Sequence, residues 1–433
     1  MLKWGVLIMA VKSYEYAYGR GTKTFELDDS RVLKEVVTQE FPPMQDIKQG
    51  VLDAIYNPIG LERIDKIIKP GDTVAFICND LTRVANSYDF MPVLVNEMNK
   101  LGVRDEDMHI LFSLGTHRNM THEEMVEAVG EEVAGRLKMY NNECKKEEDF
   151  EFFGTTSRGT PVWVNKHLCH VDHVILTGSI VQHYFSGYGG GRKAILPGCT
   201  AMETTRVNHS FMLDPNAQLG KMQGNPCYED QVEGVSLFAK GRSLFLFNAI
   251  LNAKHEFLRM YAGHYVEAHL EACKFVDQAY GCVIPKKADL VIASCGGFPK
   301  DINVYQMQKT MDNAACAVRD GGVVVLLADC EEGSGSKVLE ETFRRLVTFE
   351  AIRDELKDNF VIGANKAYAV ARPMQSARYI LVTSLDRQLA KDMHFTAAVD
   401  TVAEALAIAK EYVGETPDIV LMPEGSLTVP RVE

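Results

Sequence analysis

Short hydrophobic runs that end in polar residues are the feature that most limits how this chain folds. Three of them alternate with helical segments in the first half of the sequence: 73–78 (TVAFIC), 109–114 (HILFSL) and 174–177 (VILT). Such runs, separated by amphipathic segments, are typical of strands in a parallel α/β sheet. Ligands of open α/β sheets lie outside the carboxyl ends of the strands. The sequence therefore predicts an α/β fold in which several strand exits share one site.

Each predicted strand exit carries polar or ionisable residues. The first is followed by Asp80, Leu81, Thr82 and Arg83 (DLTR), the second by 115–118 (GTHR) with His117, and the third by 182–198 (QHYFSGYGGGRKAILPG) with His183 and Lys193. Glycines at 187, 189, 190 and 191 favour positive φ or close approach to a ligand. The loop fits neither phosphate-binding motif, because Arg192 precedes Lys193, Ala194 follows it, and Arg192 replaces the third glycine of the dinucleotide pattern.

The remaining chain predicts a second α/β unit. Strand-like runs at 289–294, 323–327 and 379–382 alternate with helical runs, one of which carries Gln306 and Lys309. Residues 200–285 look mostly helical, 22–27 look like a strand, and 47–55 and 61–68 have helical spacing. We expect two α/β domains with the active site in a cleft between them. Their predicted bounds are 1–285 and 286–413, with 414–433 returning to the first domain.

The composition limits which partners and which cellular compartment we expect for this protein. A net charge of −13 disfavours nucleic acid or an anionic membrane surface as the main partner. Ten cysteines without a CxxC pair indicate reduced thiols in a cytoplasmic protein, and neither a disulfide framework nor a thiolate zinc site. The apolar start MLKWGVLIMA is too short for a signal peptide, and Met9 is an alternative start. We expect no membrane-spanning run.

The histidines divide into two groups. His167, His170 and His173 crowd one segment but lack a matching ligand cluster, so a metal site there is not expected. His117 and His183 each follow a strand beside a glycine. Because imidazole titrates near neutral pH, with a pKa of about 6.5, the two together favour acid/base catalysis, one on each side of a substrate. Lys193 suits either a cation that binds phosphate or a covalent cofactor anchor.

The motifs DLTR, GTHR, QHYFSGYGGGRKAILPG and 208–211 (NHSF), with Gln306 and Lys309, resemble the nickel-pincer lactate racemase family from about residue 22 to 420. The resemblance implies a nickel-pincer nucleotide, a pyridinium mononucleotide whose two sulfur-bearing arms hold nickel, tethered as a thioamide to Lys193. It also implies His209 as the nickel ligand and His117 and His183 as the acid/base pair. The residues implied to line the cofactor and substrate site are Asp80, Leu81, Thr82, Arg83, Gly189, Gly190, Gly191, Gln306 and Lys309.

The implied reaction is the interconversion of the enantiomers of a small 2-hydroxy acid, lactate or a relative. Imidazole is too weak a base to remove the C2 proton beside a carboxylate, so loss of the O–H proton with transfer of a hydride from C2 is more plausible. Arg83 or Lys309 would hold the substrate carboxylate. Maturation enzymes are implied partners, and a preparation made without them is expected to lack the cofactor.

Alternative functions and some details stay open at this point. One alternative is a nucleotide- or phosphate-binding transferase or dehydrogenase that uses the glycine loop non-covalently, and another is a non-enzymatic or maturation role. Val84 stands where many members of the family have proline. The bulky residues Phe185, Tyr188 and Tyr305, near the expected substrate space, leave the substrate unassigned. The oligomeric state is also open.

Overall fold

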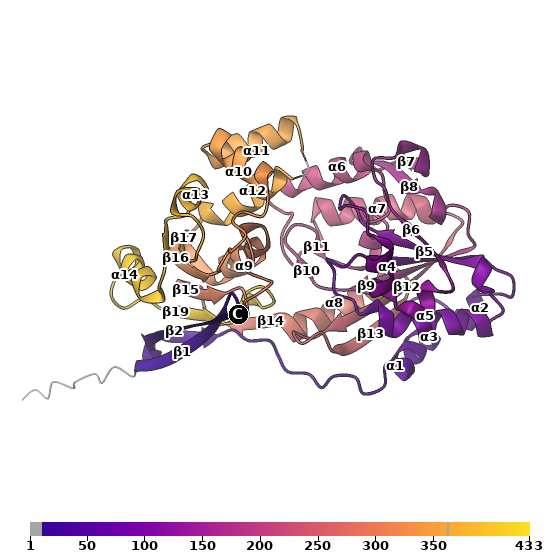
Figure 1. The fold of residues 1–433 in the computed structure, drawn as a ribbon, viewed down its shortest axis with the longest axis horizontal. Helices are drawn as coiled ribbons and strands as arrows, with labels where there is room; N and C mark the ends of the chain where they lie inside the picture. Colours follow the sequence, from indigo (N-terminus) through magenta and orange to yellow (C-terminus); the bar gives the residue numbers. More distant parts are fainter. Residues whose placement is uncertain (1–10, 362) are drawn as a thin grey trace, which may run out of the picture. The chain divides into compact units, whose positions relative to one another are not determined.

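The computed structural model describes residues 11–361 and 363–433, and the chain forms two compact α/β units (Figure 1). One unit comprises residues 41–277. The other comprises the described residues of 278–433 together with residues 11–40. The MLKWGVLIMA stretch and Met9 lie outside the described residues. The predicted fold class, two α/β domains, is confirmed, whereas the cleft between them stays a prediction.

A six-stranded sheet forms the centre of the unit of residues 41–277, in the order β13-β12-β9-β4-β5-β6. All neighbouring strands are parallel except β12 and β13. The strands are β4 (Val74–Asn79), β5 (Met108–Ser113), β6 (Lys138–Asn141), β9 (His173–Ser179), β12 (Ser243–Leu251) and β13 (Phe257–Gly263). The three predicted strands are β4, β5 and β9, adjacent in the sheet, so their exits meet at one edge.

Helices cover both faces of this sheet (Figure 1). On β4, Phe76 packs with residues of α1 and α3, whereas Ile77 packs on the opposite face with residues of α7 and α8. Burial of such a side chain contributes about 1.5–3 kcal/mol. The helices of this unit are α1 (Ile47–Tyr56), α2 (Ile64–Ile67), α3 (Ser87–Lys100), α4 (His122–Val129), α5 (Glu131–Ala134), α6 (Met202–Ser210), α7 (Pro226–Ala239) and α8 (Glu267–Tyr280). A hairpin of β7 (Phe150–Thr155) and β8 (Pro161–Asn165) completes it.

The prediction that residues 200–285 are mostly helical is wrong for β12 and β13. The run SLFLFNAIL of β12 is almost entirely buried. A strand buried on both faces has no alternation of apolar and polar residues, so its sequence resembles that of a buried helix. The predicted helix at 61–68 is shorter, since only α2 forms there.

The other unit contains an all-parallel sheet in the order β18-β17-β16-β15-β19-β3. Its strands are β3 (Val32–Glu35), β15 (Ala288–Ser294), β16 (Val318–Leu327), β17 (Arg378–Val382), β18 (Ala397–Val399) and β19 (Ile419–Met422). The hairpin of β1 (Val11–Tyr18) and β2 (Gly21–Asp28) packs with α14 (Val402–Val413) over one face. The second unit also contains α9 (Val304–Ala317), α10 (Lys337–Arg345), α11 (Phe349–Asp358), α12 (Asn365–Ala371), α13 (Arg387–Asp392), β14 (Gly281–Ile284) and β20 (Val429–Val432).

Two of the predicted domain assignments are wrong. The segment 414–433 does not return to the first domain, because β19 pairs with β15. Residues 11–40 also belong to the second unit, since β3 pairs with β19. Both pairings join segments more than a hundred residues apart, which local sequence patterns do not report.

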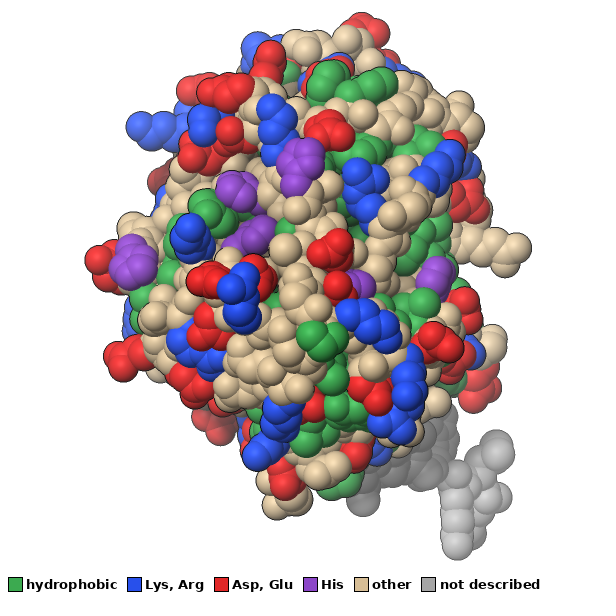
Figure 2. Space-filling view, turned by 90° about the vertical axis from the view of Figure 1, so that its right-hand side faces the viewer, with side chains coloured by type: hydrophobic (Ala, Val, Ile, Leu, Met, Phe, Trp, Pro, Cys, Tyr) green, Lys and Arg blue, Asp and Glu red, His purple; other side chains and the backbone are tan. Residues whose placement is uncertain are grey.

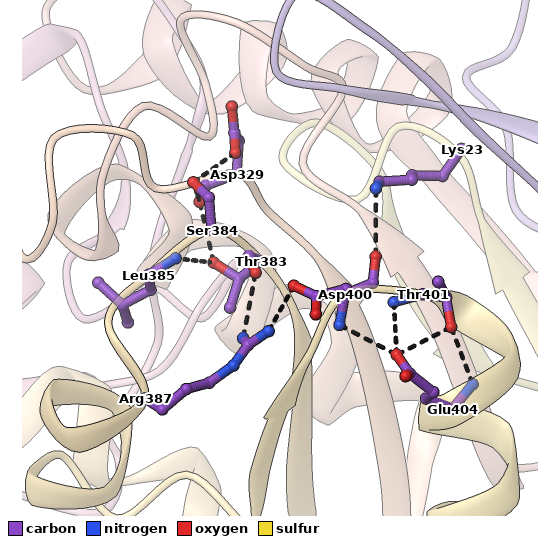
Figure 3. Close-up of polar contacts among 9 residues, drawn as sticks. All are labelled: Lys23, Asp329, Thr383, Ser384, Leu385, Arg387, Asp400, Thr401 and Glu404. Carbon is purple, nitrogen blue, oxygen red and sulfur yellow. Dashed lines mark hydrogen bonds and ion pairs between the residues drawn. The ribbon is translucent and has the colours of Figure 1, made fainter.

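The carboxyl edge of the second sheet carries its own hydrogen-bond network (Figure 3). After β17, the Ser384 hydroxyl donates to Asp329 Oδ1, which follows β16, at 2.7 Å. Arg387 donates to the Thr383 carbonyl at 3.2 Å and to Asp400, after β18, at 2.5 Å. These bonds join the exits of three adjacent strands and stabilise this edge.

No helix among the described residues has the length and apolar character needed to cross a bilayer. On the face drawn in Figure 2, acidic and basic side chains are interspersed, with histidines among them. No extended area of that face carries charge of a single sign. The expectation that nucleic acid is not the main partner stays a prediction.

Candidate active site

The loop after β4 holds a buried carboxylate, Asp80, which is 6% exposed. Its Oδ1 accepts a hydrogen bond from the Thr82 backbone N–H at 3.1 Å and another from the Thr82 hydroxyl at 2.7 Å. Such a side-chain turn is a common use of aspartate after a strand. It directs the carboxylate inward, while Leu81 and Arg83 are exposed.

His117, at the exit of β5, contacts this carboxylate. Its Nδ1 donates a hydrogen bond to Asp80 Oδ2. The turn that carries it is held by the Gly115 N–H, which donates to the Gly198 carbonyl at 2.9 Å, and Gly115 has a φ of 55°. Because the Nδ1 proton is used in this bond, Nε2 of the neutral ring is the nitrogen that can accept a proton.

The ionisation of Asp80 supports this arrangement. Burial by itself would raise the pKa of Asp80, but the hydrogen bonds from His117 and from the Thr82 hydroxyl hold the pKa below its ordinary value. Asp80 is therefore ionised at neutral pH and orients the imidazole. The sequence assigned Asp80 only to the lining of the site. The pairing of β4 with β5, which brings Asn79 opposite Ser113, explains the contact that sequence reasoning missed.

The glycine-rich loop begins as a short hairpin of β10 (Gln182–His183) and β11 (Gly187–Tyr188), then enters the 3₁₀ turn η5 (Gly191–Ala194). Gly187, Gly190 and Gly191 have φ values of 73°, 69° and 57°, so the predicted positive φ is confirmed at these three glycines but not at Gly189. A Cβ on Gly190 would lie 2.7 Å from Asn248 Oδ1, and one on Gly191 would lie 2.6 Å from the His269 ring. Packing against β12 and α8 thus requires these glycines. Cofactor binding by Gly189, Gly190 and Gly191 stays a prediction.

Phe185 brings three of the predicted site residues together. Its ring is 2% exposed and meets the His183 ring edge-on, with centroids 4.6 Å apart. The His209 ring, from α6, lies 5.0 Å away in a similar geometry. Lys193 Nζ lies 5.5 Å from the same phenyl centroid. The acid/base, metal-ligand and anchor candidates therefore surround one apolar side chain.

This crowding lowers the pKa values of His183, Lys193 and His209. His183 keeps some accessible surface, yet the protein packed around it, together with the charges of Lys193 and Arg83, lowers its pKa well below the ordinary value. Burial, and then the charge of Arg192, lowers the pKa of Lys193 to about 7. Burial, then Lys193, lowers the pKa of His209 to about 3. At neutral pH both imidazoles are neutral and the lysine amine is partly uncharged.

The structure corrects one sequence expectation about the bulky residues. Tyr188 does not line an open site: it is 1% exposed and its hydroxyl donates to Asp277 on α8. Arg192, beside Lys193 in the loop, is also 1% exposed and lies inside the fold. Its surroundings consist of residues from α7 and α8, Tyr228 and His269, that sequence reasoning did not single out.

Gln306 and Lys309 lie one turn apart on α9 of the other unit. Lys309 Nζ donates to Gln306 Oε1 at 3.1 Å. Tyr305, beside them, is 39% exposed, with Lys366 Nζ 4.3 Å from its ring centroid. Their contact with the first unit's site residues stays a prediction.

The three crowded histidines of residues 167–173 have separate partners. His167 stacks on Tyr140 with ring centroids 3.8 Å apart, and His170 lies 3.7 Å from Glu151. His173 donates to Asp72 at 2.8 Å. These contacts account for them as structural residues.

Comparison with known proteins covers nearly the whole chain. A model of the lactate racemase N-terminal domain matches residues 18–220, and one of the lactate racemase C-terminal domain matches residues 283–429. A lactate racemase of Thermoanaerobacterium thermosaccharolyticum is 30% identical over 426 residues, covering 96% of this chain and 99% of that protein. A lactate racemase of Lactiplantibacillus plantarum is 26% identical over 420 residues, covering 94% and 97%.

Solved structures agree with this match. The lactate racemase apoprotein from Thermoanaerobacterium thermosaccharolyticum superposes with a TM-score of 0.89 at 29% identity, covering 97% of this chain and all of that one. A Thermotoga maritima protein, with a TM-score of 0.68 at 17% identity over 91% of this chain, shares the fold. From both domain matches and the full-length similarity, this chain belongs to the lactate racemase family.

Proposed function

We propose that this protein racemises a small 2-hydroxy acid, lactate or a close relative, with a nickel-pincer nucleotide tethered to Lys193. The observation that carries the proposal is the meeting of His183, Lys193 and His209 at the Phe185 ring. Family membership supports the reaction class. The geometry supports the division of labour among acid/base, anchor and metal ligand.

The residues present fit such a group. His209 Nδ1 is buried, and none of the described residues offers it a hydrogen-bond partner. Buried polar atoms without a partner call for an explanation, and a bound ion is one. A neutral imidazole is a suitable ligand for nickel. Lys193 would carry the tether, because its amine is partly uncharged at neutral pH and so nucleophilic.

When bound, the nucleotide supplies a reversible hydride acceptor, and the protein's own residues handle the proton and the substrate. His117 Nε2 has a free lone pair, since Nδ1 donates to Asp80. His183 has the opposite tautomer: its Nδ1 accepts from the Ser186 N–H at 3.3 Å, which leaves the proton on Nε2. One imidazole thus begins as a proton acceptor and the other as a donor. Such a pair suits removal of an O–H proton on one side and its return on the other.

Arg83 is the first-unit candidate for the substrate carboxylate. Its guanidinium is exposed and bonds only weakly to its own turn, at 3.4 Å to the Thr82 carbonyl. Its charge acts on both His183 and Lys193. A planar guanidinium grips a carboxylate through two parallel bonds. Lys309 is the corresponding candidate of the second unit.

Two observations disfavour the non-covalent phosphate-binding alternative. A lysine whose pKa is about 7 is a poor permanent cation for a phosphate. Arg192, the other cation of the loop, is buried and donates to the Ser186 carbonyl at 2.7 Å. The loop therefore presents less fixed positive charge than its sequence suggests.

The test begins with protein purified from cells that make the cofactor. Intact mass should show an adduct that is absent from Lys193→Ala, and nickel should co-purify. Racemisation is then measured on lactate, malate, 2-hydroxyglutarate and larger 2-hydroxy acids. His117→Ala and His183→Ala should keep the adduct and lose at least about 10²-fold in rate, whereas the exposed His170→Ala is the matched control. Full activity of His183→Ala, or loaded protein that racemises none of these acids, contradicts the proposal.

A further inference from the structure

Arg192 carries a positive charge into the interior of its unit. The side chain is 1% exposed. One terminal nitrogen donates to the Ser186 carbonyl at 2.7 Å, and the guanidinium lies 4.2 Å from the Tyr228 ring centroid. Within residues 11–361 and 363–433 no carboxylate pairs with it, and its Nε has no hydrogen-bond partner. The fold thus retains a buried cation without a counter-charge.

Such an arrangement is costly and needs a reason. Desolvation of an unpaired ion opposes folding, and replacing buried ions by apolar side chains of similar volume is often neutral or stabilising. His269 does not need Arg192 as a hydrogen-bond partner. Its Nε2–H donates to the Gly189 carbonyl at 2.8 Å, whereas the Arg192 guanidinium nitrogen lies 3.4 Å from the same Nε2. What distinguishes arginine here is that, unlike lysine, it keeps its charge when buried.

The next residue supplies the reason. In the 3₁₀ turn η5, with three residues per turn, successive side chains point in different directions. Arg192 points toward Tyr228, and Lys193 toward Phe185. We propose that Arg192 is a positioning residue for Lys193: its hydrogen bond to the Ser186 carbonyl holds the turn from which the Lys193 amine projects, and its buried positive charge favours the uncharged form of that amine.

The surroundings of Lys193 agree with this role. Burial contributes most to its low pKa, about 7, and the charge of Arg192 comes next. The charged or titratable groups that act on or lie beside the amine are Arg83 after β4, His183 on β10, Arg192 on η5, His209 on α6 and Cys227 on α7. Burial keeps His183 and His209 neutral and raises the pKa of the Cys227 thiol to about 11, so at neutral pH only the two arginines are charged. Arg83 is exposed and screened by solvent.

The inference rests on the proposed function only in one respect: the proposed function is what makes Lys193 the cofactor anchor. Its test needs neither cofactor nor substrate. Full-length apoprotein is treated with limiting acetic anhydride across about pH 5.5–9.5, a range that spans the midpoint expected for a lysine of lowered pKa. The free amine displaces acetate, forms the acetyl–Nζ bond and releases a proton. Mass spectrometry then follows acetylation of Lys193 against the exposed Lys254 as internal reference.

For the wild type we expect a labelling midpoint near pH 7. Arg192→Met should raise the midpoint by about one pH unit and slow Lys193 labelling at pH 7 about fivefold. Arg192→Gln, which also removes the charge, should do the same and serves if the methionine variant folds poorly. The matched control is His269→Gln, which removes the bond to the Gly189 carbonyl without changing charge, because burial lowers the pKa of His269 to about 3.

The control separates charge from simple bracing of the loop. His269→Gln should speed hydrogen exchange in the loop but leave the labelling midpoint unchanged. Unchanged midpoints in both Arg192 variants would overturn the proposal, as would a shift in His269→Gln equal to that in Arg192→Met. Both outcomes are labelling midpoints and do not depend on racemase activity. Failure of this inference is therefore distinct from failure of the proposed function.

Discussion

Asp80→Asn is the change that most directly tests what fixes the tautomer of the His117 imidazole. The Asp80 carboxylate accepts three hydrogen bonds, two from Thr82 and one from His117 Nδ1. The introduced amide has one acceptor atom and one donor group in place of two acceptors. If its oxygen keeps both Thr82 donors, its NH₂ faces His117 Nδ1 and favours the tautomer with the proton on Nε2. That tautomer cannot accept a proton from a substrate hydroxyl.

The size of the effect follows from the mismatched donor. Placing two donors against each other, or losing the bond, costs about 1–3 kcal/mol. If this penalty falls on the catalytically competent tautomer, kcat decreases about 5- to 150-fold. The substrate carboxylate contact is not involved, so KM should change little.

The assay compares kcat for racemisation in wild type and Asp80→Asn loaded with cofactor to the same extent by intact mass. Stability gives a second readout. Because the folded-state pKa of Asp80 is lowered, its ionised form stabilises the fold above the unfolded value near 3.9, and this contribution is lost as pH falls through the folded value. The difference in free energy of unfolding should thus be fully present at neutral pH and decrease as the pH falls through the folded-state pKa of Asp80. An unchanged kcat at equal loading would refute the role given to Asp80.

Two further variants test other parts of the site. His209→Ala should release nickel while intact mass still shows the Lys193 adduct, and wild-type nickel content in this variant would exclude His209 as the ligand. Gly191→Ala should lower the free energy of unfolding by about 2–4 kcal/mol in denaturant titrations, because a Cβ there would lie 2.6 Å from the His269 ring at a φ of 57°. Gly159→Ala, at a φ of 89° with open space around it, should cost only about 1 kcal/mol, and equal losses would disprove the packing explanation.

Much of the sheet that positions the site was predictable because its strands are short, apolar and followed by polar residues. β4, β5 and β9 were all predicted. β12 was missed because burial on both faces removes the periodicity that distinguishes strand from helix. The N-terminal β3 and the late β19 were assigned to the wrong domain because their pairing is non-local.

The sequence by itself determined which chemical groups are present, His117, His183, Lys193 and His209, in the spacing of the lactate racemase family. It also indicated that the first three follow strand exits, whereas His209 lies in a helical segment. Only the tertiary structure decided the hydrogen-bond partners and the protonation states of these groups. Asp80 and His117 are 37 residues apart and meet because β4 and β5 are neighbours. The lowered pKa values of His183, Lys193 and His209 come mainly from burial, which depends on packing among segments distant in sequence. The direction of Arg192, into the fold and away from the site, likewise depends on Tyr228 of α7, a contact that no local pattern encodes.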